Sequence, residues 1–447
     1  MATTTKGKPP NSNNKSTVKF ILRALESRNY RLYFGGQGLS LVGTWIQRIA
    51  QAWLVYRLTD SVFLLGVVGF STQIPTFLMA PFAGVIVDQK NRHHILVITQ
   101  SLAALQALIL AILVLTDLIQ VWHIIVLGVI LGLINAFDMP SRQSLVVEMI
   151  ERREDLGNAI ALNSTMVNGA RLIGPTVAGI VIAAMGEGIC FLMNAGSFLA
   201  VIIALLAMRL KPPPRRERKG TLFAEFKDGF KYSFGFPPIR GILLMLALVS
   251  IMGMPYSVLM PVFAKDVLHG GPHTLGFLMG SVGTGALVGA LYLASRRSVV
   301  GLGRVIAIAA AIFGSALVAF SFSRYLWLSM ALLFFVGMGF MMQMASSNTV
   351  IQTLVDDDKR GRVMSFYAMS FFGMVPLGSF LAGSLGSKIG TPATVMIGGL
   401  CIIIGSLVFG SRLPAHGKLV RPIYQKKGIL PEVAAGLQAT NSMNERS

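Results

Sequence analysis

Two arginines of this chain stand inside long apolar stretches, where a charged side chain needs a partner or water. Insertion scales put an arginine at the centre of a bilayer at a cost of roughly 2.5–3.5 kcal/mol. Arg48 belongs to a stripe of polar residues at helical spacing, and Arg171 shares a helix face with Ser164 and Asn168. The pattern predicts a wet, cationic cavity for an anionic or acceptor-rich small molecule, lined by Gln37, Thr44, Gln47, Arg48, Gln51, Asn168 and Arg171.

Both arginines also have a structural interpretation, in which each guanidinium donates hydrogen bonds to helix carbonyls or side-chain amides. The sequence leaves the two interpretations open. No Asp or Glu lies midway along an apolar stretch, although proton coupling usually uses carboxylates within the membrane. Asp138 and Glu148, at the ends of such stretches, are the available candidates for binding a coupling proton.

Residues for catalysis, cofactor binding or metal binding are not evident. The chain has no GxxxxGK[ST] nucleotide-binding loop. Its two cysteines, Cys190 and Cys401, lie in apolar runs and are expected to be small core residues. We therefore predict that the protein is not an enzyme and that it has no cofactor and no metal site. Transport, if that is the function, would draw on an ion gradient or on the substrate's own gradient.

Twelve apolar segments carry or flank these residues, and about twenty residues are needed to cross a bilayer as a helix. The chain of 447 residues is 53% hydrophobic and 13% charged, with a mean hydropathy of +0.66. A soluble protein would carry about twice that charged fraction, so we predict an all-α integral membrane protein. The expected spans are 33–56, 62–87, 94–116, 121–139, 158–184, 189–208, 241–264, 274–294, 304–322, 325–348, 362–386 and 392–410.

The net charge of +20 is placed in alternate gaps between these segments. With a cytoplasmic N-terminus, 33 of the 39 Lys and Arg residues fall inside, and only Arg57, Lys265, Arg324 and Lys388 fall outside. Because Lys and Arg are enriched in cytoplasmic loops, both termini are predicted to be cytoplasmic. The surplus is then a topology signal with weak attraction to anionic membrane lipid, which argues against nucleic acid as a partner.

The longest interior polar stretch divides the segments into six and six. It begins KPPPRRERKG, and Leu222–Phe234 within it has the spacing of an amphipathic helix on the inner membrane surface. No cleaved signal peptide is expected at the N-terminus. The expected organisation is a disordered cytoplasmic tail (1–19), an N-terminal six-helix bundle (20–210), a cytoplasmic linker (211–239), a C-terminal six-helix bundle (240–412) and a cytoplasmic tail (413–447).

The two halves resemble each other at a shift of 204 residues. Two short charged loops, ERREDLG and DDDKRG, and the spans that follow them correspond without a gap. Internal duplication of this kind is typical of secondary transporters, which bind their substrate between the repeats. Packing alone also favours small residues in membrane helices. The small residues that coincide are Gly157 with Gly361, Gly174 with Gly378, Ala178 with Ala382, and Gly179 with Gly383.

The loop after the second span, GVIVDQKNRHHI (84–95), resembles the GxLaDrxGrk signature of the major facilitator superfamily. Four positions match, namely Gly84, Ile86, Asp88 and Arg92, whereas Gln89, Asn91 and His93 depart from it. The resemblance implies a latch that holds the outward-facing state. In that latch Asp88 meets the positive start of span 11 near Arg362, and Arg92 pairs with Asp138.

A second motif, ARLIGPTVAG (170–179), resembles the small-xxxGPxxGG motif of the superfamily's antiporter branch at Gly174, Pro175 and Gly179. Small residues allow close helix approach, and a proline permits a kink. Further stretches, including NAFDMPSRQSLVVE and RGRVMSFYAMSFFGMVPLGS, are similar to the bacterial group that contains the enterobactin exporter, over residues 20–412. That resemblance implies efflux across the bacterial inner membrane.

Together these observations predict a monomeric transporter with twelve helices in two bundles. The expected function is export of a small amphipathic molecule, siderophore-like or drug-like, by alternating access, with a proton as the possible coupling ion. Two alternatives stay open: an uptake permease or lysolipid flippase, and a transport-inactive membrane receptor or scaffold.

Overall fold

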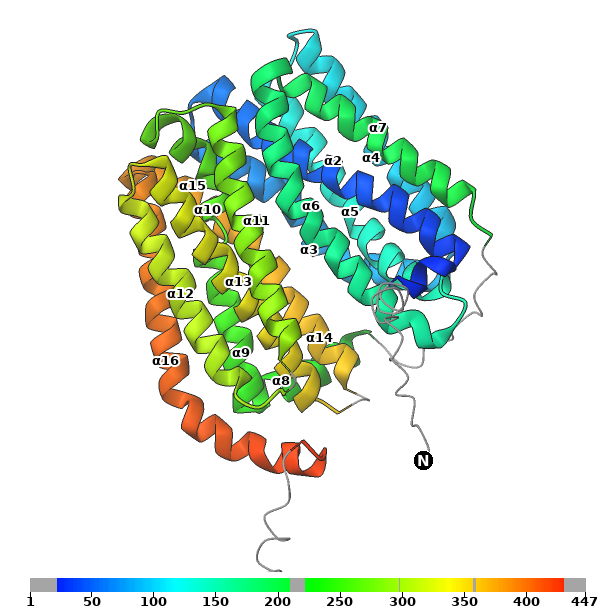
Figure 1. The fold of residues 1–447 in the computed structure, drawn as a ribbon, viewed down its shortest axis with the longest axis vertical. Coiled ribbons are helices and arrows are strands. Elements are labelled where there is room, and N and C mark those ends of the chain that lie inside the picture. Colours follow the sequence, from blue (N-terminus) through cyan, green and yellow to red (C-terminus); the bar gives the residue numbers. More distant parts are fainter. Residues whose placement is uncertain (1–21, 210–221, 297, 357–358, 430–447) are drawn as a thin grey trace, which may run out of the picture.

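A computed structural model describes residues 22–209, 222–296, 298–356 and 359–429 (Figure 1). Within those residues all regular structure is helical. The N-terminal half contains a short turn, η1 (Arg23–Glu26), and a second one, η2 (Arg153–Asp155). Its long helices are α2 (Arg28–Thr59), α3 (Val62–Gln89), α4 (Arg92–Leu115), α5 (Val121–Glu148), α6 (Leu156–Met185) and α7 (Glu187–Leu206).

The C-terminal half follows the linker helix α8 (Leu222–Gly235). Two of its membrane helices contain wide π-type turns, which often mark functional positions. The first is α9 (Pro237–Leu248), η3 (Val249–Gly253), α10 (Tyr256–Val262) and η4 (Phe263–Val267); the second is α14 (Arg360–Ala368), η5 (Met369–Gly373) and α15 (Met374–Ile389). The others are α11 (Pro272–Ser295), α12 (Leu302–Phe322), α13 (Leu326–Leu354) and α16 (Thr391–Lys426).

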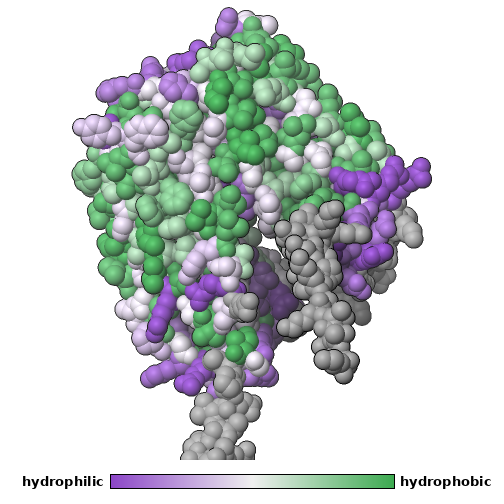
Figure 2. Space-filling model, in the orientation of Figure 1, coloured by the Kyte–Doolittle hydropathy of each residue, from purple (hydrophilic) through white to green (hydrophobic). Residues whose placement is uncertain are grey.

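Each of the twelve expected spans coincides with one of these helices. Eleven helices among the described residues are long and apolar enough to cross a membrane. The remaining expected span, α2, has 32 residues but carries the polar stripe, which lowers its hydropathy. Large apolar side chains such as Leu206 and Trp327 are exposed on the outside. Hydrophobic residues accordingly cover the sides of the molecule and hydrophilic residues gather toward its two ends (Figure 2).

Two helix ends differ most from the expected ones. Helix α5 continues through Pro140 to Glu148, although the span was expected to end at residue 139. Helix α16 continues through Pro414 and Pro422 to Lys426, beyond the expected end at residue 410. Lys427 caps the run by donating to the carbonyl oxygens of Thr353 and Val355, so the start of the expected C-terminal tail is packed helix.

The two halves lie side by side and meet along two helix pairs, α6 with α11 and α3 with α15 (Figure 1). We use "outer" and "inner" for the helix ends that the charge distribution predicts to face outside and the cytoplasm. The inner ends lie toward the bottom of Figure 1, where α8 and the last turns of α16 are found.

Candidate functional site

The two halves are in close contact at their outer ends. A Cβ atom added to Gly66 of α3 would lie 2.7 Å from the Cα of Gly383 of α15, and one added to Gly179 of α6 would lie 2.9 Å from the Cα of Gly276 of α11. Any side chain at these glycines would therefore force the backbones apart. The glycines permit a tight seam between the halves, which closes the outer end.

The inner ends are apart. Added Cβ atoms at Gly84 of α3, Gly157 of α6 and Gly361 of α14 would meet nothing within 4 Å. The space-filling view is hollowed between the halves at this lower end, with hydrophilic residues inside the hollow (Figure 2). The molecule therefore has a cleft that opens toward the inner side and ends at the closed outer seam.

Arg48 and Arg171 come together on one tryptophan. The guanidinium carbon of Arg48 lies 5.1 Å from the ring centroid of Trp45, and that of Arg171 lies 5.5 Å from the same centroid. Both distances fall within the about 6 Å range of a cation–π interaction. Helices α2 and α6 approach closely at this point, because a Cβ at Gly174 would overlap the Cβ of Trp45. The sequence stripe did not identify Trp45, although it stands three residues before Arg48 on the same helix.

Neither arginine has a carboxylate partner in the part of the chain that the structure describes. Arg48 is exposed, Arg171 is half-buried, and the Nε atom of Arg171 is buried without a hydrogen-bond partner. Tyr256 of α10, in the other half, lies within electrostatic range of Arg171. The site is thus cationic, partly wet, and built from helices of both halves.

The other expected cavity residues divide into two groups. Thr44 and Asn168 are half-buried and donate to carbonyl oxygens one turn earlier, of Ser40 and Ser164, at 2.9 Å each. These two side chains are compatible with a cleft position. Gln37 and Gln51, in contrast, are buried, at 2% and 8% exposed.

Gln47 does not line the cleft, which corrects the prediction from the stripe. Its side chain is 3% exposed, accepts a hydrogen bond from Asn194 at 2.6 Å and donates to Gln106 at 3.1 Å. Neighbouring residues of a helix point about 100° apart, so Gln47 faces α4 and α7 while Arg48 faces the cleft. The polar stripe therefore serves two surroundings, the bundle interior and the cleft.

The acid that pairs with Arg92 is Glu148, at 2.5 Å, not Asp138 as the resemblance implied. The reason is the length of α5: its true end lies ten residues beyond Asp138. Asp138 is 2% exposed and accepts hydrogen bonds from Arg142, from Gln100 at 2.6 Å and from Thr99 at 3.1 Å.

The first two turns of α14 contact the linker helix. Arg362 pairs with Asp228 of α8, and the Phe366 ring lies 6.0 Å and 6.2 Å from those of Phe230 and Phe234. The expected helix at Leu222–Phe234 is therefore confirmed. The side chain of Asp88 lies outside the described residues. Because the inner ends are apart here, the latch of Asp88 with Arg362 in the outward-facing state stays a prediction.

The antiporter-like motif packs in two directions. Gly174 lies against Trp45 within its own half, whereas Gly179 lies against Gly276 across the seam. The added Cβ of Gly276 would also lie 2.8 Å from the carbonyl oxygen of Pro175. The motif thus joins the Trp45 site to the closed outer seam.

The repeat partners of these glycines have equivalent positions. Gly378, the counterpart of Gly174, packs against Pro255 within the C-terminal half. Gly383, the counterpart of Gly179, packs across the seam against Gly66. The correspondence supports the internal duplication predicted from the sequence.

A polar clasp, which the sequence did not reveal, also joins the halves at the outer end. Lys265 of η4 pairs with Asp60 at 2.5 Å, and Tyr56 of α2 donates a hydrogen bond to Asp266. The Lys265 ammonium lies 5.3 Å from the Tyr56 ring centroid. We use "outer clasp" for these four residues.

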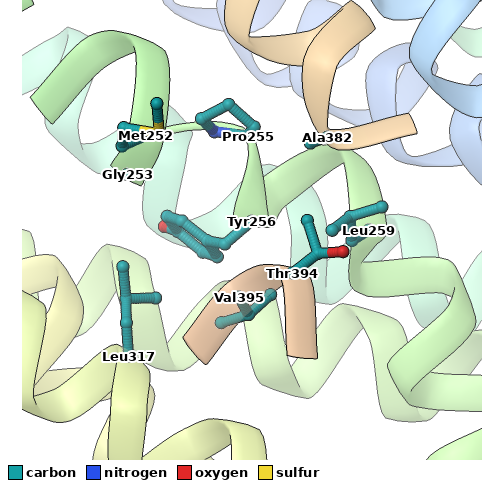
Figure 3. A pocket seen from close by; sticks show the side chains of 9 residues that line it. All are labelled: Met252, Gly253, Pro255, Tyr256, Leu259, Leu317, Ala382, Thr394 and Val395. Atoms are coloured by element: carbon teal, nitrogen blue, oxygen red, sulfur yellow. The ribbon is translucent and has the colours of Figure 1, made fainter. Parts of the chain in front are cut away.

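Within the C-terminal half, the residues around Tyr256 also enclose a small pocket (Figure 3). Its lining has hydroxyl groups on Tyr256 and Thr394 and no charged side chain, so it offers little to an anion. The lining residues are Met252, Gly253, Pro255, Tyr256, Leu259, Leu317, Ala382, Thr394 and Val395.

Comparison with known proteins places this geometry in context. The model of the family described as transmembrane secretion effectors matches residues 22–428. The staphyloferrin A transporter of Staphylococcus aureus is 26% identical over 382 residues, which cover 85% of this chain and 95% of that protein. The multidrug efflux pump Tap of Mycolicibacterium fortuitum is 26% identical over 362 residues, covering 79% of this chain and 88% of the pump.

Two solved structures share the fold. A bacterial homologue of the human lysosomal transporter Spinster, inward-facing and unoccupied, superposes with a TM-score of 0.63 at 15% identity, covering 89% of this chain and 98% of that one. The nucleoside transporter NupG superposes with a TM-score of 0.66 at 13% identity, covering 87% and 99%. These likenesses confirm the expected all-α membrane fold.

Proposed function

The chain belongs to the transmembrane secretion effector family of the major facilitator superfamily, and we propose that it exports a small, amphipathic, anionic molecule by alternating access. It is a multi-pass protein of the bacterial cell membrane. Its relatives include a siderophore transporter and multidrug efflux pumps, which favours efflux over uptake.

The observation that carries this proposal is the pair of arginines on Trp45. They stand where the cleft from the inner side meets the closed outer seam, so a molecule entering from the cytoplasm would reach them. Unpaired guanidiniums with free N–H donors bind oxyanions well. The amphipathic part of the substrate would contact the apolar walls of the cleft.

Export then requires two rearrangements. The inner ends close behind the bound molecule, and the outer seam and the outer clasp separate so that the site opens outside. In such rocking, the two halves move largely as rigid bodies about a fixed site. The Asp88 and Arg362 latch is proposed to hold the inner ends together in that second state.

The proposal is tested by the charge preference of export. Cells carrying the unmodified protein, Arg48→Gln or Arg171→Gln are loaded with an anionic compound and a neutral compound of similar size, and efflux of both is measured. We expect each variant to lower the anionic-to-neutral efflux ratio about tenfold, since a hydrogen bond to a charged group contributes about 1.5–3 kcal/mol.

Arg304→Gln is the matched control, because Arg304 is exposed at the start of α12 away from the site. It should leave the ratio unchanged. If both site variants reduce abundance alone and keep the ratio, the arginines are structural. Accumulation that rises rather than falls in cells with the protein would identify uptake instead of efflux.

A further inference from the structure

The Trp45 site carries two positive charges that no acidic side chain among the described residues neutralises. Guanidinium groups stay protonated in proteins, so Arg48 and Arg171 together contribute two positive charges. Neither forms an ion pair or a side-chain hydrogen bond with any residue that the structure describes. The site therefore lacks two negative charges.

Two buried acids of the N-terminal half already have basic partners and so cannot neutralise these arginines. Asp138 is held by Arg142, and Glu187 by Arg57 at 2.8 Å. Tyr256, the polar neighbour from the other half, is neutral while its hydroxyl stays protonated. Nothing among the described residues supplies the missing charge, so it has to come from solution ions or from a ligand.

The spacing of the arginines limits how far apart the negative charges of that ligand can lie. Both guanidinium carbons lie over one indole ring, at 5.1 Å and 5.5 Å from its centroid, and so are at most about 10.6 Å apart. An aromatic ring attracts and orients a cation without neutralising it. The N–H donors of both forks remain available, and each fork matches the geometry of one carboxylate.

We propose that the transported molecule is a dianion, with two carboxylates close together on one apolar or aromatic body, one for each arginine. Trp45 acts as the positioning residue that holds both forks toward the ligand. This inference rests on the proposed export function and adds to it the number of charges and their spacing. A monoanion would leave one guanidinium without a partner.

Binding of three matched probes tests the inference. They are benzylsuccinate, its monoamide and its diamide, which share one body and carry two, one and no negative charges at neutral pH. Affinities are measured by isothermal titration calorimetry with the full-length protein in detergent, a readout that does not depend on Trp45. We expect the unmodified protein to bind the dianion at least about tenfold more tightly than the monoamide, since one added charge-assisted hydrogen bond accounts for such a factor.

Four variants separate the roles of the residues. Arg48→Gln and Arg171→Gln should each bring the affinity ratio of dianion to monoanion close to one, while Arg171→Lys should keep part of it. Trp45→Phe should keep the ratio because an aromatic ring remains, and Trp45→Leu should lower it. Thermal unfolding of each variant identifies any that fail to fold, and such a variant is replaced by its conservative partner.

Different results reject the dianionic substrate and the export function. Equal affinity for dianion and monoanion, or an unchanged ratio in both glutamine variants, overturns the inference. The separate efflux measurement tests the export function. If neutral and singly charged compounds are exported without preference, the export function stands and only the proposal of a dianionic substrate is rejected. If no compound is exported, the export function itself is rejected.

Discussion

Gln47 and Arg48 are adjacent in the chain, and their surroundings differ completely. Gln47 connects Asn194 and Gln106 inside the N-terminal half, whereas Arg48 lies in the cleft with Trp45. A buried amide with both of its polar atoms bonded is a stabilising feature, because each partner left alone would bear its full desolvation penalty. Two adjacent polar residues of α2 thus have different roles: Gln47 stabilises the N-terminal half, and Arg48 lies at the proposed substrate site.

This difference predicts the effect of Gln47→Leu. Removing the amide leaves Asn194 and Gln106 without their partner, so we expect a loss of about 1–3 kcal/mol in stability. Thermal unfolding in detergent measures it. The anionic-to-neutral efflux ratio should stay constant per folded molecule. Gln143→Leu, at an exposed position on α5, is the control and should change neither quantity. A changed ratio in Gln47→Leu would return this residue to the substrate site.

At the level of elements, the outer seam depends on backbones that touch. The four glycines at its centre lie on α3, α6, α11 and α15, two helices from each half. A seam of this kind opens all at once, because its helices can separate only when one half rotates relative to the other. Substitutions there should act on the populations of the two states rather than on the folding of one half.

Gly179→Val tests the seam directly. Its Cβ would lie 2.8 Å from the carbonyl oxygen of Pro272 and 2.9 Å from the Cα of Gly276, so the closed outer end cannot form without displacement. We expect a population shifted away from the inward-open state. Labelling of a cysteine placed at Asn168 in the cleft should slow when the reagent is applied from the inner side. Gly196→Val, where an added Cβ meets nothing within 4 Å, should label at the normal rate.

The outer clasp makes a second prediction at this scale. Lys265 and Asp60 are 40% and 69% exposed at the side chain, so their pair is worth about 0.2–1 kcal/mol and weakens with salt. Asp60→Lys should place two like charges together and raise the outward-open population a few-fold. Asp60→Lys combined with Lys265→Asp should restore the original population. If the exchanged pair behaves like the single variant, charge pairing at this place does not hold the outer end closed.

For the whole molecule, the alternation of charge predicts the orientation in the membrane. The inner ends bear the linker helix, the open cleft and most of the Lys and Arg residues, and the outer ends bear the seam and the clasp. In the predicted orientation the open cleft faces the cytoplasm, so the proposed exporter would receive its substrate there. Orientation is therefore the premise on which the transport direction depends.

Cysteine labelling in intact cells checks that premise. In a Cys401→Ala background, with Cys190 fully buried, single cysteines replace Lys388 and Arg324 at outer ends, or Lys90 and Lys418 at inner ends; all four are exposed. An impermeant maleimide should label the first two from outside. The second two should react only after the cells are permeabilised. Labelling of Lys418→Cys in intact cells would reverse the topology.

The sequence by itself determined the membrane class, the positions of the helices and the division into halves. These depend on local composition: hydropathy over about twenty residues, and the count of Lys and Arg in each gap. It also identified Arg48 and Arg171, since a charge in an apolar run is visible without a structure. The motif glycines were found for the same reason, because a small residue at a fixed spacing is a local signal.

Only the tertiary structure decided which neighbours these residues meet. Helical periodicity gives the angle between Gln47 and Arg48 but not which of them faces the cleft, because that depends on where α4, α6 and α7 pack. Trp45 could not be distinguished from any interfacial aromatic until α6 brought Arg171 to it. Tyr56 and Asp266 are 210 residues apart in the chain, and no local pattern connects them. Contacts between distant segments arise from the packing of the two halves, which composition and spacing do not encode one residue at a time.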